Sequence, residues 1–145
     1  MRRNPLHVHK AMKAVKSSGT APEMAMRRIL WNAGLRYRLH KKELPGKPDI
    51  VFTRAKVAVF VDGDFWHGNQ WRLRGFKSLE DQLEKVGNRA YWENKIRKNI
   101  QRDRAVDTAL RKAGWKVIRI WESQVKRNPA RAAARVIRSV SGRAL

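Results

Sequence analysis

The chain has 145 residues and a formal net charge of +22, because 34 lysines and arginines stand against only 12 aspartates and glutamates. The length favours one domain with a hydrophobic core, and a 42% hydrophobic composition with six tryptophans argues against wholesale disorder. The lack of cysteine excludes disulfides and thiolate metal sites. The charge indicates a polyanionic partner, nucleic acid before a membrane surface, and fits a cytoplasmic, nucleoid-associated protein.

Residues 1–19 are expected to form a basic N-terminal arm, with a short helix near residues 10–15 and no signal-peptide stretch. The folded domain is expected over residues 20–145. Thr20 and Glu23 have the spacing of a capping box, which predicts a helix from there to about Asn32. Gly34 is a suitable residue to end it.

Three short strands are predicted next. Residues 37–40 form the first, and residues 49–52 and 56–62 form an antiparallel hairpin after the turn at residues 44–48. Residues 63–89 show no clear period, which is typical of a long functional loop.

The remaining pattern predicts a helix over residues 90–113, a central strand over 115–121 and a last helix from Pro129 to about Val140. Asn128 is the expected cap of that last helix. The fold class is α/β: a small mixed β-sheet flanked by helices.

Carboxylates at one strand edge are the first candidate site. Asp49 opens the first hairpin strand and Asp62 ends the second, and hard cations such as Mg²⁺ prefer such oxygen ligands. If Asp49 pairs opposite Phe60, Asp62 lies diagonally on the same face, whereas a one-residue slip separates them. The plainer alternative is that Asp49 closes the turn and that Asp62-Gly63 is a turn dipeptide.

His67 and Glu23 are the candidate proton-handling groups. A histidine five residues beyond a metal carboxylate can take a proton from water or give one to a leaving oxygen. Glu23 has two open roles, as the last member of the capping box or as a carboxylate of the site, and spacing alone favours the cap.

Aromatic and basic residues near these carboxylates suggest contacts with nucleic acid. Phe65, Trp66 and Trp71 can stack on bases or wedge between them, or they can fill the core. The helix over residues 90–113 has a basic surface that can follow phosphates or simply be solvated. Its basic members are Lys95, Arg97, Lys98, Arg102 and Arg104.

Five ordered motifs together resemble the Vsr family of very-short-patch DNA mismatch endonucleases, a branch of the PD-(D/E)XK nuclease superfamily. They occupy residues 12–23, 44–49, 60–67, 91–99 with 102–104, and 114–122. The resemblance implies a restriction-endonuclease-like core over residues 20–145 and Mg²⁺-dependent cutting of one strand of double-stranded DNA, with a 5′-phosphate product. Mn²⁺ is expected to substitute for Mg²⁺.

The resemblance also implies roles for individual residues. Asp49 corresponds to the metal-binding aspartate, His67 to the general acid/base and Glu23 to a helix glutamate of the site. Asp62 is expected to join Asp49 as a metal ligand and catalytic residue. The residues expected to contact DNA are Phe65, Trp66, Trp92, Lys95 and Asn99.

Departures from the family pattern limit what it implies. The structural zinc that Vsr repair enzymes usually hold is not expected here, because Asp64, Asn69 and Ser123 stand near its ligand positions. Asp62 replaces a family histidine, as in Vsr-related homing-type nucleases. The expected function is therefore an endonuclease that nicks mismatched or distorted duplex in repair or defence, with possible protein partners there. The alternative is a non-catalytic basic DNA-binding protein on a degenerate nuclease fold.

Overall fold

The computed structural model of the protein describes residues 19–84 and 86–143. Nearly all of the expected basic arm and its short helix therefore lie outside the described residues. In the described part of the chain, no helix is both long and apolar enough to cross a membrane.

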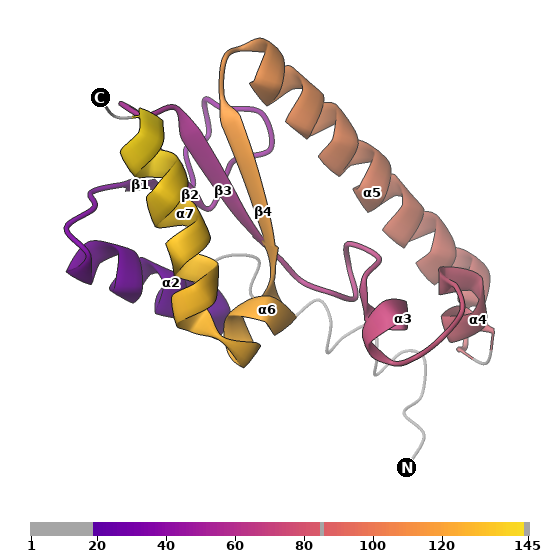
Figure 1. The fold of residues 1–145 in the computed structure, drawn as a ribbon. Helices are drawn as coiled ribbons and strands as arrows, with labels where there is room; N and C mark the ends of the chain where they lie inside the picture. Colours follow the sequence, from indigo (N-terminus) through magenta and orange to yellow (C-terminus); the bar gives the residue numbers. More distant parts are fainter. Residues whose placement is uncertain (1–18, 85, 144–145) are drawn as a thin grey trace.

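A four-stranded mixed sheet forms the centre of the fold, with strand order β1-β2-β3-β4. β1 pairs antiparallel with β2, β2 antiparallel with β3, and β3 parallel with β4 (Figure 1). The strands are β1 (Arg38–Leu39), β2 (Ile50–Phe52), β3 (Val57–Asp62) and β4 (Lys116–Trp121). The predicted α/β class with a small mixed sheet is confirmed.

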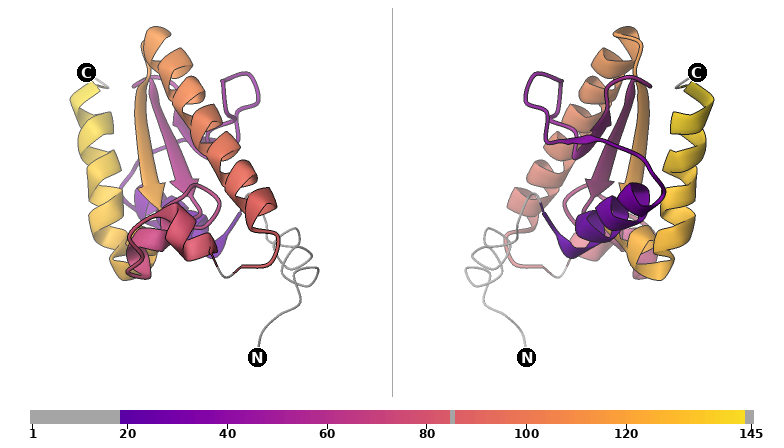
Figure 2. Two further views of the ribbon diagram at one scale, coloured as in Figure 1. Left: turned by 90° about the vertical axis from the view of Figure 1, so that its right-hand side faces the viewer. Right: turned by 90° about the vertical axis from the view of Figure 1, so that its left-hand side faces the viewer.

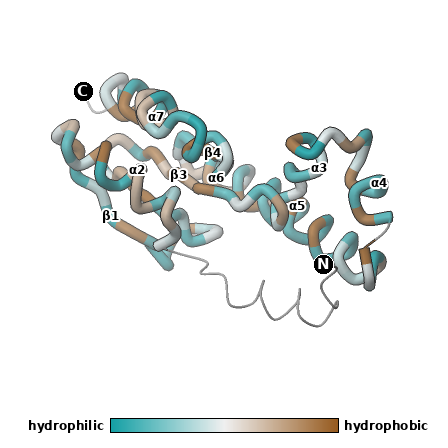
Figure 3. The backbone as a smooth tube through the Cα atoms, turned by 90° about the horizontal axis from the view of Figure 1, so that it is seen from below, coloured by the Kyte–Doolittle hydropathy of each residue, from teal (hydrophilic) through white to brown (hydrophobic). Residues whose placement is uncertain are grey.

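Helices cover both faces of this sheet, as Figure 2 shows. On one face, α2 (Ala21–Asn32) and α7 (Pro129–Arg143) bury the main hydrophobic core. On the other face, α5 (Arg89–Lys112) contributes Leu110 to a smaller core. Hydrophilic and hydrophobic residues alternate along α7 in Figure 3, as is typical of a helix with one buried face.

The predicted N-terminus of α2 is confirmed. The Thr20 hydroxyl accepts a hydrogen bond from the Glu23 backbone N–H at 3.4 Å, and Pro22 lies in the first turn. The helix ends where Gly34 adopts φ +90°, a conformation that favours glycine. Asn128 likewise caps α7, since its side-chain oxygen accepts the Arg131 N–H at 3.0 Å.

The predicted antiparallel hairpin is confirmed, and the structure decides between the two registers that the sequence left open. Ile50 pairs with Val59, so the residue before β2, Asp49, lies opposite Phe60. Phe60 and Asp62 then share the face of β3 that packs toward α5, while Val59 faces the main core.

The prediction that β4 is a central strand is wrong, because β4 is an edge of the sheet. Its apolar residues reflect burial on both faces. Ile118 and Ile120 pack in the main core, whereas Val117 packs against the α5 side. A strand that is covered on both faces reads as continuously apolar wherever it lies in the sheet.

Residues 63–89, expected to be a loop, contain two short helices, α3 (Gln70–Leu73) and α4 (Leu79–Leu83). Ser78 caps α4, and Leu79 and Leu83 pack with Trp92 and Ile96 of α5 in a third hydrophobic cluster. A further short helix, α6 (Glu122–Arg127), follows β4 directly. Such one- or two-turn helices are too short to show a hydrophobic period, and tertiary packing decides them.

Candidate active site

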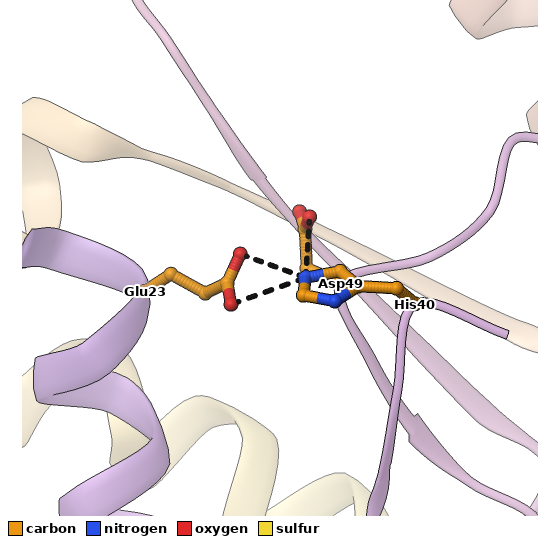
Figure 4. A group of neighbouring side chains, drawn as sticks. All are labelled: Glu23, His40 and Asp49. Carbon is orange, nitrogen blue, oxygen red and sulfur yellow. Dashed lines mark hydrogen bonds and ion pairs between the residues drawn. The ribbon is translucent and has the colours of Figure 1, made fainter. Parts of the chain in front are cut away.

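A first acidic group joins three elements near the start of β2. It consists of Glu23 from α2, His40 after β1 and Asp49 before β2 (Figure 4). One ligand atom from each lies within 4.8 Å of the others. His40 Nε2 is 3.2 Å from a carboxylate oxygen of Glu23 and 3.9 Å from Asp49 Oδ1.

Glu23 does not complete the capping box that its spacing favours. Its backbone N–H bonds to Thr20, but its buried carboxylate pairs with Arg27 and His40. The spacing of Thr20 and Glu23 cannot reveal this, because His40, one of the two partners of the carboxylate, lies 17 residues further along the chain. The carboxylate role that the resemblance implied for Glu23 therefore becomes the relevant one to test.

Asp49 lies in an environment that disfavours its charge. Burial, together with the negative charges of Glu23 and Asp62, raises the pKa of Asp49 to about 7, although the Val61 backbone hydrogen bond opposes the shift. That backbone N–H donates to Asp49 Oδ2 at 2.8 Å. A nearby cation would relieve this cost.

A second acidic group lies between the end of β3 and α5. It consists of Asp62, His67 and Asp103. His67 Nδ1 is 2.5 Å from Asp103 Oδ2, and Nε2 is 3.8 Å from Asp62 Oδ1. Because an ionised carboxylate only accepts hydrogen bonds, Nδ1 carries the proton and Nε2 is left as the acceptor.

Arg119 of β4 neutralises this second group. Its Nη1 donates to both oxygens of Asp62, at 3.2 and 3.0 Å, and lies 3.5 Å from Asp103 Oδ1. Its Nε donates to Asp107 at 2.8 Å, and the guanidinium stacks 4.0 Å from the centre of the Phe60 ring. One cation thus fixes three carboxylates from two elements.

Burial and neighbouring charges act in opposite directions on the pKa values of Asp62 and His67. Burial raises the pKa of Asp62, although His67 and Arg119 act against the shift. For His67, burial favours the neutral ring, but the Asp103 hydrogen bond and the charges of Asp62 and Asp103 outweigh it and raise the pKa. The two carboxylates therefore favour the protonated, positively charged form of the His67 ring.

The predicted metal pair Asp49 and Asp62 is divided between the two groups. The groups are nevertheless neighbours, since Asp49 bonds to the backbone of Val61 and the charge of Asp62 raises the pKa of Asp49. The side chains of Glu23 and His67, which sequence reasoning also connected, fall in different groups.

An aromatic cluster lies beside the second group. Phe65 and Trp66 are half-buried, and their rings meet edge-on with 5.5 Å between centroids. Trp92, expected to contact DNA, is only 1% exposed and packs behind both rings at 5.7 and 5.6 Å. Asn99 donates to the Trp66 carbonyl at 3.0 Å, and Lys95 Nζ lies 5.5 Å from the Trp66 ring.

A set of polar contacts holds the loop that follows β3. Asp64 accepts hydrogen bonds from the Ser123 hydroxyl at 2.7 Å, the Ser123 N–H at 3.0 Å and the Asn69 amide at 2.7 Å. We call these three residues the Asp64 clasp. It ties the segment that carries His67 to the start of α6. Its three residues stand near the ligand positions of the structural zinc that Vsr repair enzymes usually hold.

Sequence reasoning missed His40, Asp103 and Arg119. His40 was placed only as the end of a strand, and no short-range pattern connects it to Glu23. Asp103 stood in one of the motifs and lies four residues after Asn99, which places both on one face of α5. Arg119 was masked by the apolar residues around it in β4.

Comparison with known proteins identifies the family of this chain. The profile of the family DNA mismatch endonuclease Vsr matches residues 4–73. The type II nicking enzyme V.NmeDIP of Neisseria meningitidis serogroup C is 42% identical over 96% of this chain and 89% of its own length.

Two other relatives extend the comparison. The type II nicking enzyme V.HpaIIP of Haemophilus parainfluenzae is 36% identical over 90% of this chain and 89% of its own length. The DNA mismatch endonuclease Vsr of Escherichia coli strain K12 is 33% identical over 81% of this chain and 70% of its own length. The chain therefore belongs to the Vsr family of DNA mismatch endonucleases.

Proposed function

We propose that this DNA endonuclease of the Vsr family nicks one strand of duplex DNA with the help of a Mg²⁺ ion bound at Asp49. The observation that supports this most directly is the pairing of two unlike acidic groups at the ends of β2 and β3. The first group holds Asp49, with which no lysine or arginine of the described residues is ion-paired, and the second holds a histidine whose Nε2 lies 3.8 Å from Asp62 Oδ1.

The residues of the first group suit a hard cation. Asp49 and Glu23 offer carboxylate oxygens, the ligands that Mg²⁺ prefers together with water and phosphate oxygens. Asp62 is the second carboxylate that we propose for the ion, once it is released from Arg119. When bound, the ion would supply positive charge to the phosphate oxygens and acidify a bound water.

His67 is the proposed proton acceptor. With Nδ1 bonded to Asp103, its Nε2 can take a proton from the attacking water, or return one to the leaving oxygen. Asp103 acts through His67 by fixing the tautomer and the ring orientation, so it is a positioning residue. Glu23, held by Arg27 and His40, is proposed to support Asp49 from α2.

The aromatic cluster supplies the proposed preference for damaged duplex. Phe65 and Trp66 are proposed to wedge between base pairs, with Trp92 as their buried support, while Lys95 and Asn99 lie beside them on α5. Relatives named as nicking enzymes and as a mismatch endonuclease favour one-strand cleavage at mismatched or distorted sites, in repair or defence.

Nicking of supercoiled plasmid tests this function against the alternative of a non-catalytic DNA-binding protein. Wild type should nick with Mg²⁺ and should stop in EDTA. Asp49→Ala should keep DNA binding and lose at least about 10³-fold in rate, because a metal ion contributes several kcal/mol to the transition state.

Asp81→Ala is the matched control, since Asp81 is an exposed carboxylate on α4. This variant should nick like wild type. Undiminished nicking by Asp49→Ala would contradict the assignment of Asp49, and DNA binding without any nicking by wild type would favour the non-catalytic alternative.

A further inference from the structure

A cleft of about 690 Å³ lies outside both acidic groups. It is lined by residues of α3, the end of β4, α6 and α7; Figure 1 shows α6 at the end of β4, with α7 on one side of it and α3 on the other. No member of the two acidic groups lines it. It does include Asn69 and Ser123 of the Asp64 clasp, so it adjoins the segment that carries His67.

Four arginines give this cleft its chemical character. They are Arg127, Arg131, Arg135 and Arg138. Among the described residues, no aspartate or glutamate lines the cleft. Arg131, Arg135 and Arg138 follow one another at spacings of four and three residues, which brings them to one side of α7. Arg127, at the end of α6, lines the same cleft.

These arginines differ from the others near the site in having no counter-charge. Within residues 19–84 and 86–143, none of the four is ion-paired with a carboxylate, whereas Arg27 and Arg119 are. Like charges at such spacings repel one another, so this arrangement is unfavourable for the free protein. An anionic ligand would remove that repulsion.

Part of the cleft is already held in place. Arg135 Nη1 donates to the Arg119 backbone carbonyl at 3.2 Å, on the edge of β4 that carries no neighbouring strand. Arg127, Arg131 and Arg138 are exposed and line the cleft together with the polar residues Gln124 and Asn128. Guanidinium groups bind phosphate oxygens with two parallel hydrogen bonds, which suits a chain of phosphodiesters.

We propose that this arginine cleft binds the backbone phosphates of duplex DNA beside the cut site. It is a second phosphate-binding surface, distinct from the aromatic cluster and from α5. The duplex reaches it along the end of the sheet, past the segment that carries His67. This inference deepens the proposed function, since it assigns where the substrate flanking the nick is held.

The test is the salt dependence of DNA binding, measured by fluorescence anisotropy in EDTA so that no cleavage occurs. The variant Arg127→Gln/Arg131→Gln/Arg138→Gln removes three charges and leaves the structural hydrogen bond of Arg135. Each phosphate contact contributes about 0.9 to the log–log slope, so this variant should lose about 2 to 3 from the slope of wild type.

Two matched variants make the result specific. Arg54→Gln/Arg111→Gln/Lys112→Gln removes three exposed charges at the opposite end of β3 and α5, and should keep the wild-type slope. The charge-preserving variant Arg127→Lys/Arg131→Lys/Arg138→Lys should also keep most of it. Equal losses in the cleft variant and the distant variant would overturn the proposal.

The same salt dependence, measured with a single-stranded oligonucleotide of equal length, distinguishes binding of duplex phosphates from binding of single-strand phosphates. The cleft variant should change the slope for duplex more than for single strand, and the reverse would overturn the assignment to duplex. Plasmid nicking is read separately. If wild type fails to nick while the slope difference persists, the nuclease proposal falls and the cleft proposal stands.

Discussion

The two acidic groups contain similar residues but differ in how their charge is balanced. In the second group, Arg119 donates to Asp62 at 3.0 Å, and His67 is bonded to Asp103. In the first group, the closest basic side chain to Asp49 among the described residues is His40, with Nε2 at 3.9 Å. Arg27 pairs with Glu23 of the first group, but no lysine or arginine of the described residues is ion-paired with Asp49, so we propose that a metal ion balances the charge of Asp49.

This difference gives each group a separate task. A carboxylate whose pKa is raised to about 7 by burial gains most from an external cation. A histidine whose ring is fixed by a carboxylate on one nitrogen is suited to move a proton on the other. We therefore propose that the metal ion binds chiefly at Asp49, with Asp62 of the second group as its second carboxylate, and that His67 transfers the proton.

Removal of the Asp103 carboxylate should expose the role of the second group. Asp103→Asn should lower the maximal nicking rate by about 10²-fold, the lower end of what acid–base groups contribute. Loss of that anion also lowers the pKa of His67, so the acidic limb of the pH–rate profile should move to lower pH. The measurement is the nicking rate against pH at saturating Mg²⁺.

Asp107→Asn is the control for this variant, because Asp107 bonds to Arg119 and not to His67. It should leave the acidic limb in place. If both variants slow the reaction equally without moving the limb, Asp103 has a purely structural role.

A smaller effect is expected when the aromatic cluster is changed and both acidic groups are left intact. Unstacking a base step costs a few kcal/mol and costs less where pairing is broken, so wild type should cut mismatched duplex about tenfold faster than perfect duplex. Trp66→Ala should bring this ratio close to one in a paired-substrate assay.

Trp71→Ala is the matched variant, since Trp71 packs against the same cluster and is also half-buried. It should keep the ratio. Equal cutting of both duplexes by wild type, or loss of folding in Trp66→Ala alone, would assign the Trp66 ring to the core.

The smallest expected change is the response to zinc removal. Hydrogen bonds of the Asp64 clasp join the residues that stand near the family's zinc-ligand positions. Dialysed protein should therefore contain no stoichiometric zinc, and EDTA should leave its melting temperature unchanged. Asp64→Ala should lower the free energy of unfolding by about 1–3 kcal/mol, because the buried amide of Asn69 loses its acceptor. Tightly held zinc would contradict this view of the loop.

Local patterns were sufficient to predict most of the scaffold. The cap at Thr20, the antiparallel hairpin and the long helix all depend on residues close in sequence, and each is confirmed. The edge position of β4 was not predictable in this way, because it depends on which strands lie beside it and not on its own residues.

The site was predictable only in part, for a related reason. Asp49, Asp62 and His67 stand in motifs whose residue types suggest chemistry by themselves. Their partners do not: His40 contacts Glu23 across 17 residues, from a strand end, and Asp103 contacts His67 across 36 residues, from the middle of a helix. Charge balance, which distinguishes the two groups, arises only when the chain has folded.

The central claim is that Asp49 forms a cation site whose charge no lysine or arginine of the described residues compensates. It is tested most directly by urea unfolding of wild type and Asp49→Asn with Mg²⁺ and with EDTA. A carboxyl group whose pKa is raised in the folded state costs stability as pH rises from the unfolded value, near 3.8, toward about 7. In EDTA at pH 7, Asp49→Asn should therefore be more stable than wild type, by about 1–3 kcal/mol, and the two should converge near pH 4. Mg²⁺ should stabilise wild type and leave Asp49→Asn unchanged. Equal stability in EDTA at pH 7, with equal stabilisation of both by Mg²⁺, would contradict the claim.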